Sequence, residues 1–598
     1  MTKEQVLEVI IDKGGKLNEG NPWATSEKIY DRLRRELGYW KALGASNSVI
    51  SWLGYGVPMR FVKEPKHLAF PNHKRGNNDS EARAYMAKDM TKHIDTGCFV
   101  LAPTGSVLVA NPTLIIQQEG KWRRCDDCRY GNSFQAQVHF RMASLGRDIP
   151  ITTKLDDEAI TRDLEKAYYK IPMAEEARPY MAFEWAGKYY FSMVMLFGMC
   201  QAPLYFTRIC KDIAALFGAL KIPNISYIDD WYWPVEKGST PDMSTYVLKL
   251  FGRLGWSFNS KGEEGTTVKL LGFIIDLVGR KFVVPKEKRD TTLALLHEHN
   301  LMAGVGLVEV KPLQRMMGKV ISMTLAIPGC KVWCRDLFSQ IARAADQQTP
   351  WITLQKGARE ELKELIVLLS LSEGSPFVHP ATDIEIWVDS GETGWGAHTS
   401  NGVKTRDWFE TEWIGKSSTA RELKGLSMAI SALSTHIKGK VVKLNMDSMC
   451  AVRNIIKGGG PVAELRDLIK EIWHLCNTLS AQLVPHWLSR SAQGMVVADA
   501  LLKTATKWQL TQAFRVSTEL KLGMEVVFPD VADAKATLMK ALSTGWRGAL
   551  ILPAWTGQTW WQTVCDNMKI HEIKHVTQAI EPNTHGLPRW SFVVAEFI

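Results

Sequence analysis

The sequence predicts a multidomain protein of mixed α/β (α+β) class, and three observations carry this prediction. The chain has 598 residues, which is too long for a single hydrophobic core. Hydrophobic residues make up 45% and charged residues 23%, the composition of a globular protein rather than a disordered or fibrous one. Strand-like and helix-like patterns are mixed along the chain, without a repeat at solenoid periods.

Changes of pattern and Gly, Pro and Asn punctuation divide the chain into segments. The predicted segments are residues 1–95, 96–285, 286–378, 379–505 and 506–598. The first mixes amphipathic helix with a basic loop at Pro71–Asn78, the second mixes strands with helices, and the third is mainly helical with scattered basic positions. Those basic positions fit a duplex-gripping element or an ordinary solvated helix face, and both interpretations stay open.

Strands are predicted in the last two segments. Ile384, Ile386 and Val388 alternate with polar residues, as in a half-buried strand, and Ala549–Leu552 is an apolar, strand-like run. The final segment also contains the tryptophans Trp555, Trp560 and Trp561. These could contact nucleic acid or a partner, although burial is the more common explanation for tryptophan. The sequence predicts no chemistry for this segment.

Charge and cysteine content indicate the setting of the protein. The formal net charge is +10 with a pI near 8.9, which favours a polyanion partner but also suits many proteins that bind none. Ten cysteines without a dense framework indicate reduced thiols and an intracellular protein of the cytoplasm or nucleus. Cys125 and Cys128 form one CxxC pair, but no second pair stands at zinc spacing. We therefore expect strand cysteines rather than a metal site.

Targeting signals are not expected. The first residues, MTKEQVLEVIIDKGGKL, predict a short amphipathic helix instead of the long apolar core of a signal peptide. No apolar run approaches the roughly 18 residues that cross a bilayer. The sequence thus predicts neither secretion nor a membrane span.

A first set of carboxylates stands between residues 163 and 230. Ile225–Trp233 reads ISYIDDWYW, which predicts two short strands joined by a turn that carries Asp229 and Asp230. Asp163, in TRDLEKAYYKIP, lies far enough upstream for intervening structure to bring it back to this pair. Aspartate also favours turns, so a purely structural hairpin is the alternative.

Clustered carboxylates are what nucleotide polymerisation needs. Two magnesium ions about 3.5–4 Å apart require several carboxylates to offset their repulsion. One ion activates the primer 3′-hydroxyl and the other stabilises the departing pyrophosphate. We expect Mg²⁺ at two per site, and Mn²⁺ suits the same oxygen ligands.

Several ordered motifs resemble the palm and fingers of reverse transcriptases, which implies a right-hand fold of fingers, palm and thumb. The motifs are DLEKAY with Asp163, FGMCQAP at Phe197–Pro203, YIDD at Tyr227–Asp230, LLGF at Leu270–Phe273 and KWRRCDDCRYGN at Lys121–Asn132. The resemblance implies that Asp163, Asp229 and Asp230 bind the metals. An upstream fingers lysine found in some relatives has no clear match in this chain.

The same resemblance implies a set of substrate contacts. Arg123 and Lys121 would lie over the incoming triphosphate, and Tyr168 would exclude the 2′-hydroxyl of ribonucleotides. Further implied contacts are Gln201, Tyr227 and Lys261. For Tyr168 the alternative is a tyrosine that is simply packed in a helix.

A second set of carboxylates lies between residues 389 and 499. Asp389 ends the strand IEIWVD, Glu422 opens a helix in STARELKGL, Asp447 ends the strand VVKLNMD and Asp499 lies in the helix VVADALLK. Two strand ends and two helices can converge on one point, where four carboxylates would bind two divalent metals. The alternatives are a capping box of Thr419 with Glu422 and ordinary strand-end aspartates.

This order resembles ribonuclease H, in which paired metals activate water against an RNA phosphodiester. Gly391–Gly396 after the first acid and Ala498 before the last agree with the resemblance. It implies that His486 assists product release. Met495 stands where relatives often keep an asparagine, so this end of the site departs from the family pattern.

Softer strings resemble the DIRS-type, tyrosine-recombinase retrotransposons. They are YYKIPM, YIDDW, LQRMMGKV at Leu313–Val320 and PAW…WW, and the whole resemblance spans Tyr39 to Trp561. The implied partners are an RNA template, a DNA primer, the RNA–DNA hybrid and dNTPs, with any recombinase or integrase on a separate chain and no membrane. Alternatives are a domesticated, non-catalytic nucleic-acid binder and a protein with only one active site.

Overall fold

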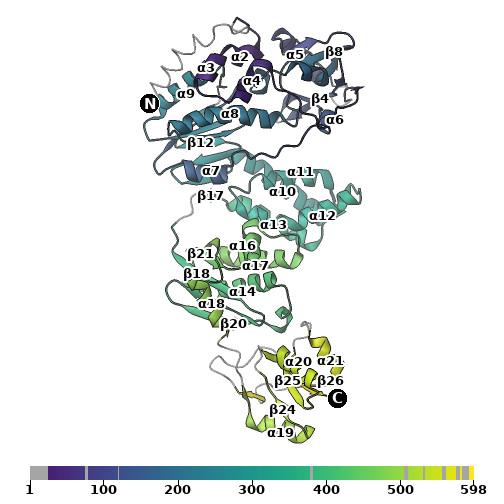
Figure 1. Ribbon diagram of the computed structural model, residues 1–598, viewed down its shortest axis with the longest axis vertical. Coiled ribbons are helices and arrows are strands. Elements are labelled where there is room, and N and C mark those ends of the chain that lie inside the picture. The colour runs from purple at the N-terminus through teal and green to yellow at the C-terminus, as the bar shows by residue number, and fades with distance from the viewer. Residues whose placement is uncertain are drawn as a thin grey trace. The chain divides into compact units, whose positions relative to one another are not determined.

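The computed structural model confirms the mixed α/β class and divides the chain into two compact units, Met1–Pro285 and Lys286–Ile598 (Figure 1). The described residues are 25–73, 79–118, 120–260, 262–377, 381–503, 509–529, 533–554, 560–573, 579–581 and 592–597. The expected N-terminal helix, the end of the Pro71–Asn78 loop, Lys261 and Trp555 lie outside them. Among the described residues, no helix has the length and apolar character needed to cross a membrane.

The first unit contains helices of 3 to 18 residues and several sheets. Its helices are η1 Ile29–Asp31, α2 Arg32–Arg35, α3 Leu37–Ala42, α4 Asn47–Tyr55, α5 Ser80–Asp95, α6 Arg129–Asn132, α7 Leu145–Thr152, η2 Tyr168–Lys170, η3 Glu175–Tyr180, α8 Ala202–Ala219 and α9 Thr240–Arg253. Its strands are β1 Leu68–Ala69, β2 Phe99–Leu101, β3 Val109–Ala110, β4 Thr113–Gln118, β5 Lys121–Asp126, β6 Glu158–Asp163, β7 Ala182–Trp185, β8 Lys188–Ser192, β9 Ile225–Tyr227, β10 Asp230–Val235, β11 Glu263–Gly265, β12 Thr267–Leu270, β13 Phe273–Asp276 and β14 Lys281–Val283.

The central sheet of this unit has the strand order β11-β6-β10-β9. Trp231 and Trp233 of β10 are fully buried and stack with ring centroids 5.4 Å apart, against Phe217 of α8 and Phe251 of α9. Tyr232 points to the opposite face, because successive side chains of a strand alternate, and its hydroxyl lies 2.9 Å from the Thr153 hydroxyl. Burial on both faces explains the continuous apolar run of this strand.

A second sheet, of order β1-β3-β7-β8-β2, lies beside the two-stranded hairpin β4-β5. Arg124 of β5 points inward, where its guanidinium lies 3.9 Å from the Phe183 ring centroid and 2.6 Å from an Asp126 oxygen. Lys121 and Arg123 lie on the other, exposed face of the same strand. Alternation along β5 therefore separates the inward-pointing Arg124 from two exposed cations on the surface.

The second unit contains a helical part, a five-stranded sheet with helices, and a smaller C-terminal sheet. Its helices are α10 Lys286–Val305, α11 Val310–Ile321, η4 Pro328–Lys331, α12 Arg335–Asp346, α13 Lys356–Leu371, η5 Thr411–Trp413, α14 Ser418–Ala432, α15 Ser434–Ile437, α16 Met449–Lys457, α17 Ala463–Thr478, α18 Gln493–Lys503, α19 Gln512–Leu522, α20 Ala534–Thr544 and α21 Trp561–Asn567. Its strands are β15 Leu307–Glu309, β16 Trp351–Thr353, β17 Ser375–Pro376, β18 Ile384–Ser390, β19 Gly394–Thr399, β20 Lys404–Trp408, β21 Val441–Met446, β22 Gln482–Trp487, β23 Gln509–Leu510, β24 Val526–Val527, β25 Ala549–Pro553, β26 Met568–Glu572, β27 Ile580–Glu581 and β28 Phe592–Phe597.

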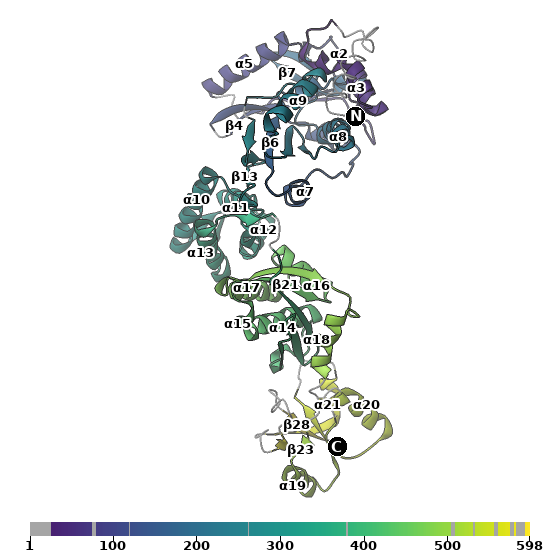
Figure 2. The same cartoon turned by 90° about the vertical axis from the view of Figure 1, so that its left-hand side faces the viewer.

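Helices α10 to α13 group together, as Figure 2 shows, and ion pairs around one buried carboxylate connect α12 and α13 to α17. Glu361 of α13 is fully buried and accepts hydrogen bonds from the backbone N–H groups of Asp336 and Leu337, in the first turn of α12. Lys470 of α17 donates to both Glu361, at 2.9 Å, and Asp336, at 2.8 Å. The helix N-terminus and the Lys470 ammonium together offset the charge of the buried Glu361 carboxylate.

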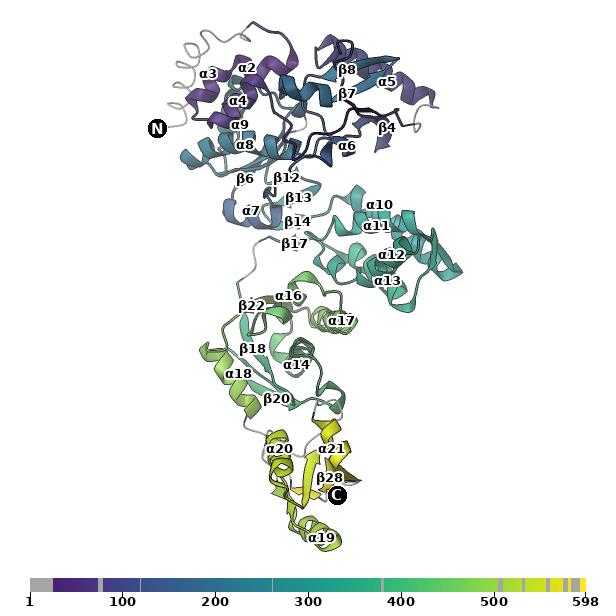
Figure 3. The ribbon, with the colours of Figure 1, turned by 45° about the vertical axis from the view of Figure 1, so that its right-hand side comes forward.

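The five-stranded sheet has the order β20-β19-β18-β21-β22, with β18, β21 and β22 parallel. Helices α14 and α17 lie on one face and α18 on the other (Figure 3). A side chain at Gly396 of β19 would meet the Ala498 carbonyl oxygen of α18 at 2.8 Å, so this glycine permits the close approach. The predicted strand at Ile384 is confirmed as β18.

The C-terminal sheet has the order β24-β25-β28-β26, and its β25 confirms the strand predicted at Ala549–Leu552. Its core includes Trp560, 4% exposed, together with Trp408 and Ile414 from the preceding part of the unit. The Trp560 side chain is thus packed in the core instead of being exposed for contact with a ligand.

Candidate active sites

The three carboxylates of the first set meet at one end of the central sheet. Strands β9 and β10 form the predicted hairpin, with Asp229 in its turn. In the antiparallel pairing of β10 with β6, Asp230 stands opposite Asp163. The Leu164 N–H also donates to the Asp229 carbonyl oxygen at 3.0 Å. Strand register therefore brings the two distant parts of the sequence together.

The turn between β9 and β10 has an unusual backbone. Ile228 has φ +53°, in the left-handed region that branched side chains rarely occupy. Its side chain packs against the hydrophobic core, and its carbonyl oxygen accepts from the Cys210 thiol at 3.6 Å. Such conformations typically cost about 1–3 kcal/mol and persist where the surrounding structure holds them. Packing from α8 therefore helps hold the turn that carries Asp229.

Burial and mutual repulsion perturb these acids. Burial, then the charges of Asp229 and Asp163, raise the pKa of Asp230 to about 7. The pKa of Asp229 is raised as well, by burial first and then by the Asp163 charge. Asn259 donates a side-chain hydrogen bond to Asp163, and its backbone N–H donates to the Asp163 carbonyl oxygen at 2.9 Å. Hard oxygen ligands whose charges repel one another fit divalent cations such as Mg²⁺.

Tyr168 lies beside this cluster. Its side chain is 4% exposed, with its ring centroid 4.6 Å from that of Phe197 and 5.3 Å from that of Phe206. Burial, and then the Asp229 charge, raise its pKa. The tyrosine is thus packed, in the 3₁₀ helix η2, and also close to a candidate metal ligand. Its role against a 2′-hydroxyl stays a prediction.

The side chain of Gln201 is hydrogen-bonded to the protein's own backbone. Its side chain, 3% exposed, donates to the carbonyl oxygens of Arg60, at 3.2 Å, and Ala136, at 3.1 Å. This arrangement fixes two chain segments relative to the start of α8. Contacts of Gln201, Tyr227, Lys121 and Arg123 with substrate stay predictions.

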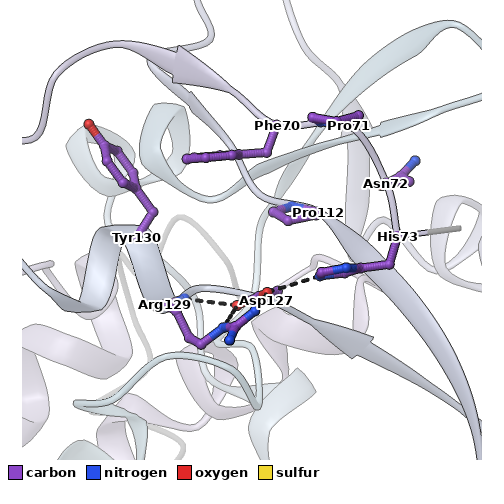
Figure 4. A pocket seen from close by; sticks show the side chains of 8 residues that line it. All are labelled: Phe70, Pro71, Asn72, His73, Pro112, Asp127, Arg129 and Tyr130. Atoms are coloured by element: carbon purple, nitrogen blue, oxygen red, sulfur yellow. Dashed lines mark hydrogen bonds and ion pairs between the residues drawn. The ribbon is translucent and has the colours of Figure 1, made fainter. Parts of the chain in front are cut away.

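A pocket of about 690 Å³ opens in the first unit, and the sequence did not reveal it (Figure 4). It is lined by Phe70, Pro71, Asn72, His73, Pro112, Asp127, Arg129 and Tyr130. Asp127 binds Arg129 at 2.6 Å and His73 at 2.9 Å, and these contacts hold the pKa of Asp127 well below its usual range. Aromatic and proline rings on one side and a charged pair on the other suit a planar polar ligand.

The CxxC pair lies next to this pocket and corrects one expectation. Cys125 lies in β5, as expected, but Cys128 follows the strand and precedes the first residue of α6. Cys128 is buried, and a side chain at Gly198 would meet its sulfur at 2.9 Å. One cysteine of the pair therefore lies within β5 and the other after its end, because β5 ends at Asp126, before α6 begins at Arg129.

The second carboxylate set forms a compact cluster. Asp389 of β18, Glu422 of α14 and Asp447, directly after β21, have ligand atoms within 4.8 Å of one another. Parallel pairing of β18 with β21 places the first and last at the same sheet edge. Among the described residues, these are the acids that form such a group of three.

The capping-box alternative for Glu422 is wrong. The residue that caps α14 is Ser417, whose hydroxyl accepts from the Ala420 N–H at 3.2 Å. Glu422 lies in the second turn and is 5% exposed. Its carboxylate is thus buried in the acid cluster instead of reaching back to the helix start.

The raised pKa values of these acids agree with a cation-binding site, because they reflect crowded negative charge. Burial first, then Asp389 and Asp447, raise the pKa of Glu422 to about 9. Burial, then Asp447, raise the pKa of Asp389 to about 6. The Oε2 atom of Glu422 is buried and has no hydrogen-bond partner among the described residues. A divalent cation would supply that partner and offset the repulsion.

Asp499 and His486 lie at the margin of the cluster. Asp499, on α18, is outside the group of three, but its charge contributes to the raised pKa of Asp389. His486 is exposed on β22, where its Nδ1 lies 3.1 Å from the Trp487 carbonyl oxygen. Met495, in the first turn of α18, is buried at 1% exposure. The role expected for His486 stays a prediction.

Arg490 is a candidate functional residue that sequence reasoning missed. It follows β22 in the short loop before α18, and its Nε lies 3.0 Å from Asp447 Oδ2. Trp487 also donates its indole N–H to the Asp447 carbonyl oxygen at 2.9 Å. The available signal was a basic residue in the loop that precedes the helix of Asp499.

The perturbed Glu422 gives a prediction about metal-free protein. Its pKa of about 9 exceeds the value of 4.5 expected in the unfolded chain, so its contribution to stability is complete below pH 4.5 and is lost as pH rises towards 9. We expect Glu422→Gln, in chelator at pH 8, to raise the melting temperature by at least about 2–4 °C, the effect of roughly 1 kcal/mol. Thermal melts between pH 5 and 9 check this.

Exposed Glu410→Gln is the matched control and should leave the pH slope unchanged. With Mg²⁺ added, the wild type should gain stability that Glu422→Gln does not. Parallel pH slopes for wild type and Glu422→Gln would contradict the buried, protonated carboxyl.

Comparisons with known proteins give distant structural similarities. No protein-family model and no curated protein matches the chain. A foamy viral protease-reverse transcriptase dRH in complex with ds DNA is similar at 15% identity and a TM-score of 0.46, covering 80% of this chain and 81% of that one. The foamy viral protease-reverse transcriptase in complex with an RNA/DNA hybrid is similar at 14% identity and a TM-score of 0.45. The match covers 81% of this chain and 63% of that one. The functional assignment therefore depends on the residues of the two sites.

Proposed function

We propose that this chain is an RNA-directed DNA polymerase with ribonuclease H activity, which copies RNA into DNA and degrades the RNA of the hybrid. One observation carries the proposal: two separate carboxylate clusters lie at strand ends of one chain. Asp163, Asp229 and Asp230 meet through antiparallel register, and Asp389, Glu422 and Asp447 meet within 4.8 Å. Repelling acids kept together are costly unless cations hold them.

In the polymerase site, Asp163, Asp229 and Asp230 would hold two Mg²⁺ ions. When bound, these ions supply activation of a primer 3′-hydroxyl and stabilisation of the charge on the transferring phosphoryl group. Tyr168, buried near Asp229, would exclude a sugar 2′-hydroxyl and so favour deoxynucleotides. Lys121 and Arg123, on the exposed face of β5, present cations for a triphosphate.

Two surfaces of the first unit suit the template strand. The pocket of Figure 4 offers the rings of Phe70 and Tyr130, 5.1 Å apart, on which a base could stack, with Arg129 beside them. A cavity of about 360 Å³ includes Arg141, Arg147 and Lys211 in its lining. Cations there would neutralise backbone phosphates, and binding should weaken with salt.

In the ribonuclease H site, Asp389, Glu422, Asp447 and Asp499 would hold the divalent ions. These ions supply the activation of a water that attacks the RNA phosphodiester. Glu422 is the buried side of the cluster, at 5% exposure. The Asp447 side chain is 13% exposed, and we call this its open side. His486, exposed on the neighbouring strand β22, would assist release of the product.

The subgroup is also a proposal. The strings YYKIPM, YIDDW, LQRMMGKV and PAW…WW support a DIRS-type retrotransposon origin. We include a recombinase or integrase on a separate chain as a proposed partner.

The proposal is tested by dNTP incorporation on an RNA template with a DNA primer under Mg²⁺. We expect the intact chain to extend the primer and to shorten the RNA of the product hybrid. A domesticated binder would instead show salt-sensitive binding to primer-template without incorporation. Extension without RNA cleavage would leave the polymerase as the one active site.

A further inference from the structure

The loop between β22 and α18 brings a cation to the open side of the acid cluster. Arg490 Nε lies 3.0 Å from Asp447 Oδ2, while its side chain is 73% exposed and that of Asp447 is 13% exposed. The guanidinium is therefore anchored at one point and otherwise surrounded by solvent. The same Asp447 is one of the three acids whose ligand atoms lie within 4.8 Å of one another.

Two cations compete for this carboxylate. An ion held by Asp389, Glu422 and Asp447 would lie close to the guanidinium, and like charges repel at that separation. Buried Asp389 and Glu422 have no room to move away, being 1% and 5% exposed. The Arg490 side chain has room to move, because it is 73% exposed to solvent. Metal entry thus favours release of the Arg490–Asp447 pair.

The released guanidinium stays at the edge of the site, where an RNA phosphate has to lie in order to be cleaved. Guanidinium groups bind phosphate oxygens with two parallel hydrogen bonds, so they suit this contact. We infer that Arg490 is an exchange residue, which pairs with Asp447 in the metal-free protein and binds the RNA backbone of the hybrid once metal takes Asp447. The inference deepens the proposed ribonuclease H function and rests on it.

The first test measures metal binding, not activity. In a full-length Asp229→Asn, Asp230→Asn background, which removes two of the three proposed polymerase ligands, Mn²⁺ is titrated into Arg490→Gln by calorimetry. We expect Mn²⁺ to bind about two- to fivefold more tightly, since an exposed ion pair no longer competes. Arg490→Lys should fall between, because it keeps the charge but loses the planar fork.

Exposed Arg453→Gln, on α16, removes a charge from the same domain and is the matched control. Its Mn²⁺ affinity should equal that of the background. An unchanged Mn²⁺ affinity in Arg490→Gln, or an equal change in Arg453→Gln, would overturn the inference.

The second test measures hybrid recognition in the same background at saturating Mg²⁺. We expect Arg490→Gln to raise KM for RNA–DNA hybrid cleavage several-fold with a smaller change in kcat. A KM equal to that of the Arg453→Gln control would overturn the phosphate contact.

The outcome also separates this inference from the proposed function. If Mn²⁺ fails to bind the background protein, or binds equally after Asp389→Asn, the ribonuclease H site itself is wrong. If Mn²⁺ binds and the hybrid is cleaved while Arg490→Gln behaves as the background, only the exchange role is wrong.

Discussion

Replacing Asp229 with asparagine is expected to reduce dNTP incorporation on an RNA template by at least about a thousandfold. Asp229 lies in the β9–β10 turn next to Asp163 and Asp230, and asparagine keeps its shape while removing a charged ligand. Loss of roughly 4 kcal/mol of transition-state stabilisation corresponds to that factor. Primer extension under Mg²⁺, with wild type and variant at equal concentration, measures it.

The matched control is Asp242→Asn, which changes an exposed aspartate of α9 in the same unit. It should extend the primer like the wild type. Thermal melts separate loss of chemistry from loss of folding. We expect Asp229→Asn to melt no lower than the wild type in chelator, because it removes repulsion among half-buried acids. Retained incorporation in a folded Asp229→Asn protein would show that polymerisation, if present, uses another site.

Sequence periodicity and local motifs predicted the elements that carry most of the acids. The apolar and aromatic residues around Asp229 and Asp230 predicted the hairpin, and the alternation from Ile384 predicted the strand that carries Asp389. These signals are local, so they are readable without tertiary structure. The convergence of Asp389, Glu422 and Asp447 follows from parallel strands whose ends share one sheet edge.

Other features depend on contacts between distant residues and were missed. The role of Arg490 appears only when the loop after β22 is placed beside Asp447. The pocket of Figure 4 joins residues around Phe70 with Pro112 and Tyr130, which are far apart in the sequence. The capping-box alternative at the start of α14 is excluded because Ser417 and Thr419 are both good caps and the backbone uses the first.

Two glycines allow the helices of the second site to pack closely against its sheet, and secondary-structure preference does not predict this packing. A side chain at Gly396 would meet α18, and one at Gly425 of α14 would lie 2.1 Å from the Ser390 hydroxyl. Each glycine lets a helix approach the sheet next to Asp389. Without these approaches, Glu422 and Asp499 would stand farther from the strand ends that carry the other acids.

Replacing Asp447 with asparagine is expected to reduce cleavage of the RNA in an RNA–DNA hybrid by at least about a thousandfold, with primer extension unchanged. Asp447 belongs to the compact acid group of the second unit, and loss of one charged ligand removes several kcal/mol from metal-assisted hydrolysis. Release of labelled RNA fragments under Mg²⁺ measures the first effect, and incorporation on the same preparation measures the second.

Exposed Asp467→Asn, on α17, is the control and should cleave normally. A loss of both activities in Asp447→Asn would contradict two independent sites, and retained cleavage would contradict this metal group. The two aspartate variants together are decisive because they alter different units. If Asp229→Asn loses only incorporation and Asp447→Asn loses only cleavage, each cluster performs its own metal-assisted reaction. A domesticated binder predicts no such pattern, since neither variant has an activity to lose.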